Sequence, residues 1–326
     1  MRVITSLTNL VLTPNAIALG NFDGIHLGHQ KVLQPILQTS AIVGCTASVS
    51  LQEPVRNREF PYSTVVTFNP HPQEFFTGQI KQLLTPLSEK VKLLEALGVE
   101  QLILLPFDRE LAALSPQQFV EEVLVRQLQA TRISVGEDFR FGNKRTGTAG
   151  DLREIAANFN IEVAIASLQT CQGSDSQLRI SSSLIRQALA EGDIPQANQM
   201  LGRAYTLTGE VVTGQQLGRT IGFPTANLQL PQIKLLPRYG VYCVRLILGE
   251  DKETIVKGVM NIGCRPTVEG NAPTVEVHLL DWSGDLYGQT LMVSLEKFLR
   301  PEQKFPSLDA LKAQISEDCN MARTIL

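Results

Sequence analysis

Short apolar runs alternate with amphipathic segments through the first part of the chain. The runs have the length of strands, and the amphipathic segments repeat their apolar residues at helical spacing. This alternation is typical of strand–helix–strand units that feed a parallel sheet, so an α/β domain is predicted. The expected strands are Ala16–Gly20, Thr64–Phe68, Gln101–Leu105, Arg132–Val135 and Ile161–Ser167.

Two of the intervening helices carry start signals. Thr85 and Pro86 supply a cap and a first-turn proline, and Gly98 follows the last apolar position of that helix. Ser115 and Gln118 have the spacing of a capping box, in which each side chain bonds the other residue's backbone N–H. A helix is therefore expected to begin at each of these points.

The pattern changes after Asp193, where a short helical segment ends at Gly202. Beyond it, strands follow one another through turns without intervening helices, which favours a small antiparallel β-barrel. Ser307 is the expected cap of a closing C-terminal helix. The predicted domains are residues 1–190 and 191–326. The expected barrel strands are Tyr205–Val212, Tyr239–Leu248, Thr254–Ile262, Thr274–Leu280 and Thr290–Leu299.

Length and composition agree with two domains, because 326 residues with 43% hydrophobic side chains exceed one typical core. The formal charge of −3 argues against a nucleic-acid partner, since such proteins depend on basic surfaces. The number of cysteines, five, is odd, and none forms a C-x-x-C pair. Reduced structural thiols are expected, without a disulfide framework or thiolate zinc site.

The location predicted from the sequence is the cytoplasm, without a membrane partner. Pro14 and Asn15 interrupt the apolar stretch Val11–Leu19, which indicates a strand and not a secretion signal. Later apolar runs fall short of the roughly 18 residues that span a bilayer. Ser48–Tyr62 lacks periodicity and is expected to be a surface loop.

The run Gly20–Gln30 directly follows the first strand and opens a helix. Its glycines let backbone amides approach a ligand, a helix N-terminus offers unpaired N–H groups, and His26 and His29 lie three residues apart. This pattern predicts a triphosphate cradle. The plainer alternative is a glycine-rich turn with two surface histidines, whereas a zinc site would need further ligands of the H-E-x-x-H kind.

A second run, Arg179–Arg186, also precedes a helix and contains three consecutive serines. Serines at a helix start supply capping hydroxyls and amides, and Arg179 adds positive charge suited to pyrophosphate. Alone, such a run is an ordinary cap. Its pairing with the H-x-G-H sequence upstream favours a second part of a phosphate site.

Together these runs resemble the nucleotidyltransferase superfamily. Further matching runs are Thr67–Pro72 and Val135–Gly142, followed by Arg145 and Gly147. The whole set is similar to the N-terminal module of prokaryotic bifunctional riboflavin kinase/FMN adenylyltransferases. This resemblance implies a Rossmann-like fold. Many relatives carry an acidic residue at the position of Asn69, so this position receives no charge-dependent role. The resemblance implies catalytic roles for His26 and His29, ATP binding by Gly20, Phe22, Asp23, Gly24, His26, Gly28, His29, Arg179, Ser182 and Ser183, and a flavin and nucleotide cleft at Asn69, Pro70, His71, Asp138 and Phe139.

The expected barrel carries a glycine-rich loop, Gly218–Asn227, between its first two predicted strands. It lacks the G-K-[ST] of a Walker loop, but Thr225 and Asn227 offer neutral oxygens that suit Mg²⁺ held mostly by phosphates. Glu276 alternates with valines in its strand, so its side chain faces away from theirs. A plain hairpin turn and a solvated glutamate are the alternatives to a site.

The second half of the chain is similar to the riboflavin kinase module, in motif order and nearly throughout. The matching runs also include Tyr239–Tyr242, Gly258–Gly263, Arg265–Thr267, Asp285–Gly288 and Phe298–Pro301, with a departure at Val268, where relatives often carry an aromatic residue. The resemblance implies that Glu276 is the base for riboflavin's hydroxyl and that Thr225 and Asn227 hold Mg²⁺. It implies ATP binding by Gly218, Arg219, Gly222, Phe223, Pro224, Thr225 and Asn227.

The implied function is ATP-dependent conversion of riboflavin into FMN and then FAD, with small-molecule partners. FMN's phosphate is already a nucleophile, so no general base is expected in the N-terminal module. A nucleotidyltransferase for a pantetheine or nicotinamide phosphate would leave Glu276 without a role. A non-catalytic flavin- or RNA-binding regulator would not explain two phosphate sites in an acidic chain. The oligomeric state is open, with a weak homo-oligomer as one option.

Overall fold

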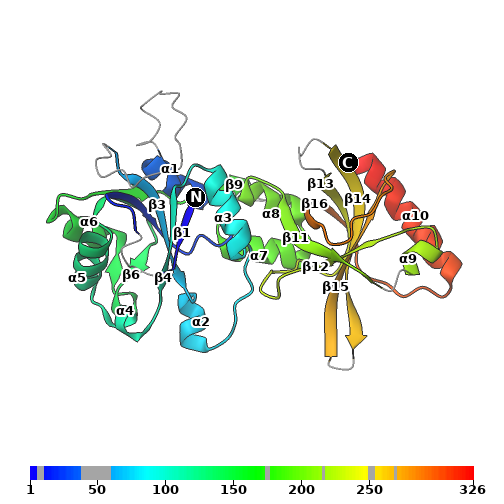
Figure 1. Ribbon diagram of the computed structural model, residues 1–326, viewed down its shortest axis with the longest axis horizontal. Helices are drawn as coiled ribbons and strands as arrows, with labels where there is room; N and C mark the ends of the chain where they lie inside the picture. The colour runs from blue at the N-terminus through cyan, green and yellow to red at the C-terminus, as the bar shows by residue number, and fades with distance from the viewer. Residues whose placement is uncertain (6–10, 38–59, 173–176, 215–216, 249–253, 268–269) are drawn as a thin grey trace. The chain divides into compact units, whose positions relative to one another are not determined.

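The computed structural model describes residues 1–5, 11–37, 60–172, 177–214, 217–248, 254–267 and 270–326 (Figure 1). The chain divides into two compact units. The boundary near residue 190 drawn from the sequence stays a prediction, as does the loop Ser48–Tyr62, which lies almost wholly outside the described residues. Unit 1 comprises Met1–Lys81, Leu87–Gln172 and Gln177–Ile180, and unit 2 consists mainly of Gln82–Pro86 and Ser181–Leu326.

A parallel sheet organises unit 1. Among the described residues it has six strands in the order β1-β4-β3-β2-β5-β8, and every neighbouring pair is parallel. The five strands predicted from the sequence are confirmed, whereas β1 was not predicted. The strands are β1 (Arg2–Ile4), β2 (Asn15–Leu19), β3 (Tyr62–Asn69), β4 (Gln101–Pro106), β5 (Ala130–Gly136) and β8 (Glu162–Ala166).

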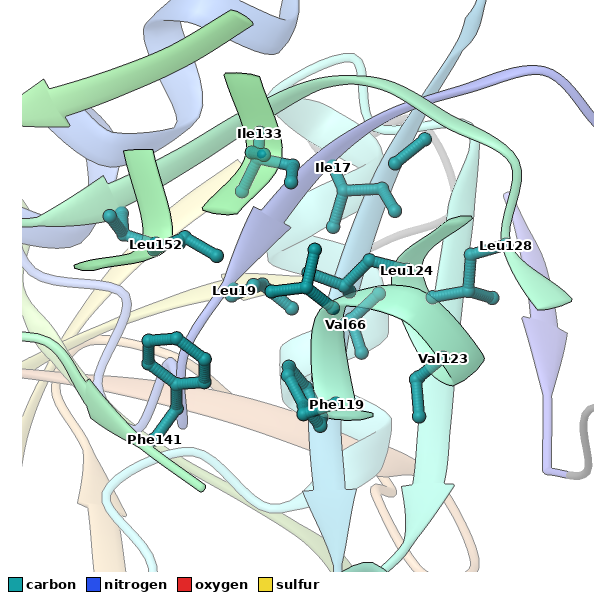
Figure 2. Packing of buried hydrophobic residues seen from close by; sticks show 14 of the residues in the cluster. Ile17, Leu19, Val66, Phe119, Val123, Leu124, Leu128, Ile133, Phe141 and Leu152 are labelled. Carbon is teal, nitrogen blue, oxygen red and sulfur yellow. The ribbon is translucent and has the colours of Figure 1, made fainter. Parts of the chain in front are cut away.

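Helices cover both faces of this sheet, and strand β2 shows why. Ile17 and Leu19 belong to one apolar cluster, whereas Ala16 and Ala18 belong to the other, as the alternation of side chains along a strand requires. The first cluster includes residues of the helical segments η1 (Phe119–Gln127) and α6 (Ala149–Ala157), and the second includes residues of α1 (Leu27–Leu37) and α3 (Leu87–Ala96). Figure 2 shows the first cluster.

The predicted capping box at Ser115 is confirmed. The Ser115 hydroxyl accepts from the Gln118 N–H, and the Gln118 side chain accepts from the Ser115 N–H at 2.9 Å. The helix that follows becomes π-helical from Phe119. Gly98, with a φ of 88°, lies just beyond α3 as expected. The smaller elements of unit 1 are α2 (Pro72–Thr77), α4 (Arg109–Ala113), α5 (Pro116–Gln118), η2 (Asn143–Arg145), β6 (Arg140–Phe141), β7 (Gly147–Thr148), β9 (Thr170–Gln172) and β10 (Gln177–Arg179).

Unit 2 contains a closed antiparallel barrel with strand order β11-β12-β15-β14-β13-β16. It follows two short helices, α7 and α8, which end at Gly192 and Gly202 with left-handed backbone. The five predicted barrel strands are confirmed with small shifts at their ends. The elements are α7 (Ser182–Glu191), α8 (Ile194–Leu201), β11 (Tyr205–Val212), α9 (Leu217–Thr220), β12 (Ala226–Gln229), β13 (Gly240–Leu248), β14 (Thr254–Thr267), β15 (Gly270–Leu279), β16 (Thr290–Arg300) and α10 (Leu308–Ile325).

Strand β12 was not predicted, and it corrects the expected loop Gly218–Asn227. Ala226 and Asn227 lie in this strand, where they pair with Val277 and Glu276 of β15. Within the residues that the structure describes, those are the only pairs between β12 and β15, whereas β14 and β15 pair over ten positions. The barrel is therefore closed by one very short line of pairing, the β12–β15 seam.

The C-terminal helix α10 begins after Ser307, whose hydroxyl accepts from the Ala310 N–H at 3.1 Å as predicted. Its buried Cys319 and Ala322 share a cluster with Cys243 of β13. Burial raises the pKa of Cys243 to about 11 and also raises that of Cys319, so both thiols stay protonated at neutral pH. Within the described ranges, no helix has the length and apolar content needed to cross a bilayer.

Leu124→Ala should destabilise unit 1 by about 2–5 kcal/mol, because the leucine is fully buried in the cluster of Figure 2 and its removal leaves a cavity. Urea denaturation followed by circular dichroism measures this loss. Leu308→Ala is the matched control, since Leu308 is 59% exposed and should change stability by less than about 0.5 kcal/mol. Equal effects of the two substitutions would contradict the assigned core.

Candidate active sites

Three predicted site segments follow adjacent strands at the same edge of the sheet. Strand β2 lies between β3 and β5, and all three run parallel. Their carboxyl ends lead into Asn69–His71, Gly20–His29 and Gly136–Phe139. The chain places β3 and β4 on one side of β2 before it returns to β5 on the other side. Open α/β sheets bind ligands where the strand order reverses in this way.

The turn after β2 has an unusual backbone. Phe22, Gly24 and Ile25 have φ values of 48°, 93° and 42°. Glycine tolerates this left-handed region, but phenylalanine and the β-branched isoleucine do so at a cost. Both side chains are only 1% exposed, so burial holds the turn in its conformation. Strained backbone that its surroundings enforce is characteristic of ligand-binding turns.

His26 and His29 come together at the start of α1. The backbone N–H of His29 donates to Nδ1 of His26 at 3.2 Å, and the two rings stack with centroids 3.7 Å apart. Because Nδ1 accepts, the neutral His26 ring carries its hydrogen on Nε2. His26 therefore acts as a side-chain cap of the helix.

His71 caps α2, the short helix after β3. Its Nδ1 accepts from the Gln73 N–H at 3.0 Å, and Lys81 Nζ lies 3.2 Å from its Nε2. Burial, followed by the charge of Lys81, lowers the pKa of His71 to about 4, although Asp23 and Glu74 act in the opposite direction. His71 is therefore neutral at physiological pH and contributes no positive charge to the predicted cleft.

Asp138 and Arg179, both predicted site residues, form an ion pair. Asp138 follows β5, and Arg179 ends β10, so the pair links two motif runs that lie far apart in the sequence. Both side chains are about half exposed, and such pairs contribute little stability. Asn69 and Pro70 are exposed at the end of β3, and Phe139 stacks on a neighbouring phenylalanine.

The serine run starts helix α7 in unit 2. Ser181 is the cap, because its hydroxyl accepts from the Leu184 N–H at 3.3 Å. Ser182 and Ser183 are the first two helical residues, whose N–H groups lack acceptors within the helix. The predicted combination of hydroxyls and amides at a helix start is confirmed.

Sequence reasoning missed Lys90 of α3, which is only 8% exposed. Its ammonium donates to the carbonyl oxygen of Asn21, in the turn after β2, at 2.9 Å. Burial lowers the pKa of Lys90 to about 8, opposed by attraction to Asp23 and reinforced by repulsion from Lys81. Helical spacing could have indicated that Lys90 is buried, because it lies four residues before the buried Leu94 and thus on the same face of α3.

A row of polar residues crosses the barrel in unit 2. Glu276 of β15 pairs with Asn227 of β12 on one side and with Asn261 of β14 on the other. The next row, Ala226, Val277 and Met260, is buried, so the polar row faces the opposite side of the strands. Directly opposed side chains on one face lie within interaction distance. The structure thus joins predicted Glu276 and Asn227, and it adds Asn261, which only strand register could reveal.

The glycine-rich segment is fixed against the same strand. His278, two residues beyond Glu276, donates from Nδ1 to the Pro224 carbonyl at 2.8 Å, and its ring packs on Phe223. Gly218 accepts from the Phe223 N–H at 2.8 Å, which closes the segment on itself. The remaining predicted residues of the loop, Arg219, Gly222 and Thr225, lie within or directly after this closed segment.

Gly214 lies against the side chain of Asn227, one of the two predicted Mg²⁺ ligands. A Cβ added at Gly214 would collide with the Asn227 amide, so the glycine leaves space for that side chain. Thr225 and Asn227 supply neutral oxygens, which suit Mg²⁺ when phosphates provide the negative charge. In the part of the chain that the structure describes, no three His, Cys, Asp or Glu residues form a metal-binding group.

Fold and site geometry define the class: a two-module transferase, with a nucleotide-binding α/β module and a barrel module that carries a carboxylate. Family models agree with this division. The model described as FAD synthetase matches residues 9–184, and the model described as Riboflavin kinase matches residues 201–326. The chain belongs to the bifunctional riboflavin kinase/FMN adenylyltransferase family, and both enzymatic modules are present.

Relatives support this membership, and one solved structure has a similar fold. The chain is 42% identical to the bifunctional riboflavin kinase/FMN adenylyltransferase of Escherichia coli (strain K12), over 99% of this chain and 97% of that protein. It is 34% identical to the protein of the same name from Bacillus subtilis (strain 168), over 93% and 90%. The crystal structure of a Macrolide-efflux Protein from Streptococcus pneumoniae is similar with a TM-score of 0.81 and 29% identity, covering 98% of both chains.

The ring of His71 should titrate near pH 4 in an NMR experiment, with its signals assigned by comparison with His71→Gln. Lys81→Gln should raise the pKa, because it removes the nearby positive charge, whereas Lys92→Gln on the exposed side of α3 should not change it. Since the folded pKa lies below 6.5, folding stability should fall as the pH drops from about 6.5 to 4. A midpoint near 6.5 would contradict the buried environment.

Proposed function

We propose that the C-terminal module, residues 191–326, phosphorylates riboflavin to FMN and that the N-terminal module, residues 1–190, adenylylates FMN to FAD, each with ATP. The main support is a difference between the two sites. The barrel row holds a carboxylate, Glu276, between two amides, whereas the turn of unit 1 presents amides and imidazoles at a helix start. The carboxylate suits a weak nucleophile, the hydroxyl of riboflavin, whereas the turn suits the phosphate of FMN, which needs no base.

The kinase step requires activation of a hydroxyl. Riboflavin's 5′-hydroxyl is a weak nucleophile at neutral pH, and a positioned base contributes roughly 10²- to 10⁴-fold in rate. Glu276 takes the hydroxyl proton while the oxygen attacks the γ-phosphorus of ATP, and ADP leaves. The amides of Asn227 and Asn261, opposite Glu276 on both sides, orient the carboxylate. Gly218, Arg219, Gly222, Phe223 and Pro224 enclose the nucleotide.

Thr225 and Asn227 are the residues that would hold Mg²⁺ in this module, with ATP phosphates as the remaining ligands. The ion supplies neutralisation of the charge that develops on the phosphates during transfer. The anchoring of Pro224 by His278 keeps Thr225 close to strand β15 before substrate binds. Preorganisation of this kind reduces the entropy that is lost when the nucleotide is positioned.

The adenylyl transfer step requires alignment more than activation. A phosphate oxygen of FMN attacks the α-phosphorus of ATP, and pyrophosphate leaves with its negative charge. His26, His29, Arg179, Ser182 and Ser183 donate to the phosphates, together with the backbone of Gly20, Phe22, Gly24 and Gly28; Asp23 lies in the same turn. Asn69, Pro70, His71, Asp138 and Phe139 line the flavin and nucleotide cleft. This module needs no general base.

Location and partners remain part of the proposal. The acidic chain has no global attraction for nucleic acid, and its proposed substrates are small molecules. We therefore assign the protein to the cytoplasm, without nucleic-acid or membrane partners.

Glu276→Gln should lower the rate of FMN formation by about 10²- to 10⁴-fold, because only the hydroxyl needs a base. Externally supplied FMN should still be converted into FAD. The assay incubates wild-type and variant protein with riboflavin or FMN, ATP and Mg²⁺, and separates the flavins by chromatography. The wild type should convert riboflavin into both products. Loss of both half-reactions in a folded variant would overturn the division of labour.

The double variant His29→Ala, Ser182→Ala should convert riboflavin into FMN without further conversion into FAD. Removal of two phosphate donors leaves charge on the departing pyrophosphate uncompensated, and each lost donor costs about 10²-fold or more in rate. The same chromatographic assay measures the ratio of FAD to FMN. FAD formation at the normal rate would show that the site of adenylyl transfer lies elsewhere.

A further inference from the structure

The buried lysine of α3 has a place in unit 1 that the proposed chemistry leaves unused. Lys90 Nζ donates to the carbonyl oxygen of Asn21 at 2.9 Å, and the hydroxyl of Thr67 donates to the same oxygen at 3.2 Å. Two donors from different elements thus hold one carbonyl. Asn21 directly precedes Phe22, the first left-handed residue of the turn.

This contact fixes the orientation of the turn. A carbonyl that accepts from two buried donors cannot rotate without breaking both hydrogen bonds, so the planar peptide unit that it shares with the Phe22 N–H is held. That unit begins the strained stretch through Gly24 and Ile25. The amides of such a stretch must already point toward a phosphate if they are to stabilise transferred charge without reorganisation.

The contact also brings charge to the turn. Lys90 attracts Asp23, the buried acidic residue of the turn, and is repelled by Lys81 of the segment after α2. His71, at the start of α2, feels the charge of Lys90 as well. Asp23, Lys81 and His71 are therefore the titratable groups whose charges couple to Lys90 from the other elements. A buried ammonium supports an anion site because low-dielectric surroundings strengthen its field.

We propose that Lys90 is a positioning residue for adenylyl transfer, which holds the Asn21 carbonyl and places a positive charge behind the phosphate-binding turn. This inference rests on the proposed function of that turn. Lys90 acts through Asn21 and the backbone that follows, and it does not exchange a proton with substrate. Its charged form is the active one, since a neutral amine gives a weaker hydrogen bond and no field.

The test compares Lys90→Met and Lys90→Arg with wild type and with Lys92→Met, a control at an exposed position of the same helix. Conversion of FMN into FAD is measured as kcat/KM for ATP, and the kinase reaction of the same chain reports the amount of active protein. Lys90→Met should lower adenylyl transfer by about 10- to 100-fold without changing the kinase. The Lys92 variant should behave like wild type. A Lys90→Met protein with wild-type adenylyl transfer would overturn the proposal.

The pH profile separates positioning by charge from a purely structural role. In the wild type, kcat/KM should decline as the pH rises through about 8, because this profile reports groups of the free enzyme and Lys90 loses its proton there. Lys90→Arg keeps its charge and should shift the decline upward by at least one pH unit. We call the decline of kcat/KM at high pH the alkaline limb. The proposal is contradicted if the wild type shows no such limb, or if Lys90→Arg shows it at the same pH. This test holds even if Lys90→Met fails to fold.

A further arm distinguishes this inference from the function on which it rests. His29→Ala alone should also lower adenylyl transfer but should leave the alkaline limb where the wild type has it. If His29→Ala retains full activity, the assignment of the turn is wrong. If it loses activity while the Lys90 variants behave like wild type, the turn is the site and the role of Lys90 is wrong.

Discussion

The parallel pairing of β3 and β5 with the two edges of β2 is the constraint on which unit 1 depends. It makes the strand order reverse at β2, which is the point where open α/β sheets bind ligands. The turn Gly20–His29 begins there and can adopt left-handed backbone only because its apolar side chains are buried beneath it. Sheet topology therefore determines where the proposed site lies, and local burial holds the conformation of its turn.

In unit 2 the proposed site residues are brought together by strand pairing. Strand register, not a turn, brings Asn227, Glu276 and Asn261 into one row, while the buried row beside it keeps the strands in that register. A shift by one residue would exchange the polar and apolar rows, at the cost of burying a carboxylate. The two proposed reactions also need different side chains. A hydroxyl nucleophile needs a base, whereas a phosphate nucleophile needs only alignment and compensating charge.

Much of this architecture could be predicted from the sequence, since the strands of both units, the capping box at Ser115 and the cap at Ser307 are local signals. Strand β12 could not, because four residues give only two positions on each face and no measurable period. The loop prediction for Asn227 was wrong for that reason. The pairing of Asn261 with Glu276 and the contact of Lys90 with Asn21 depend on residues distant in sequence, which no single segment encodes.

The β12–β15 seam has a mechanical consequence. Only the pairs Ala226–Val277 and Asn227–Glu276 join these strands, whereas longer ladders close the rest of the described barrel. Among the described strands, parting the wall along this line separates the fewest residue pairs, so local opening favours it. Asn227 and Glu276 thus lie on the two strands that separate most easily, while the remaining ladders hold the barrel together.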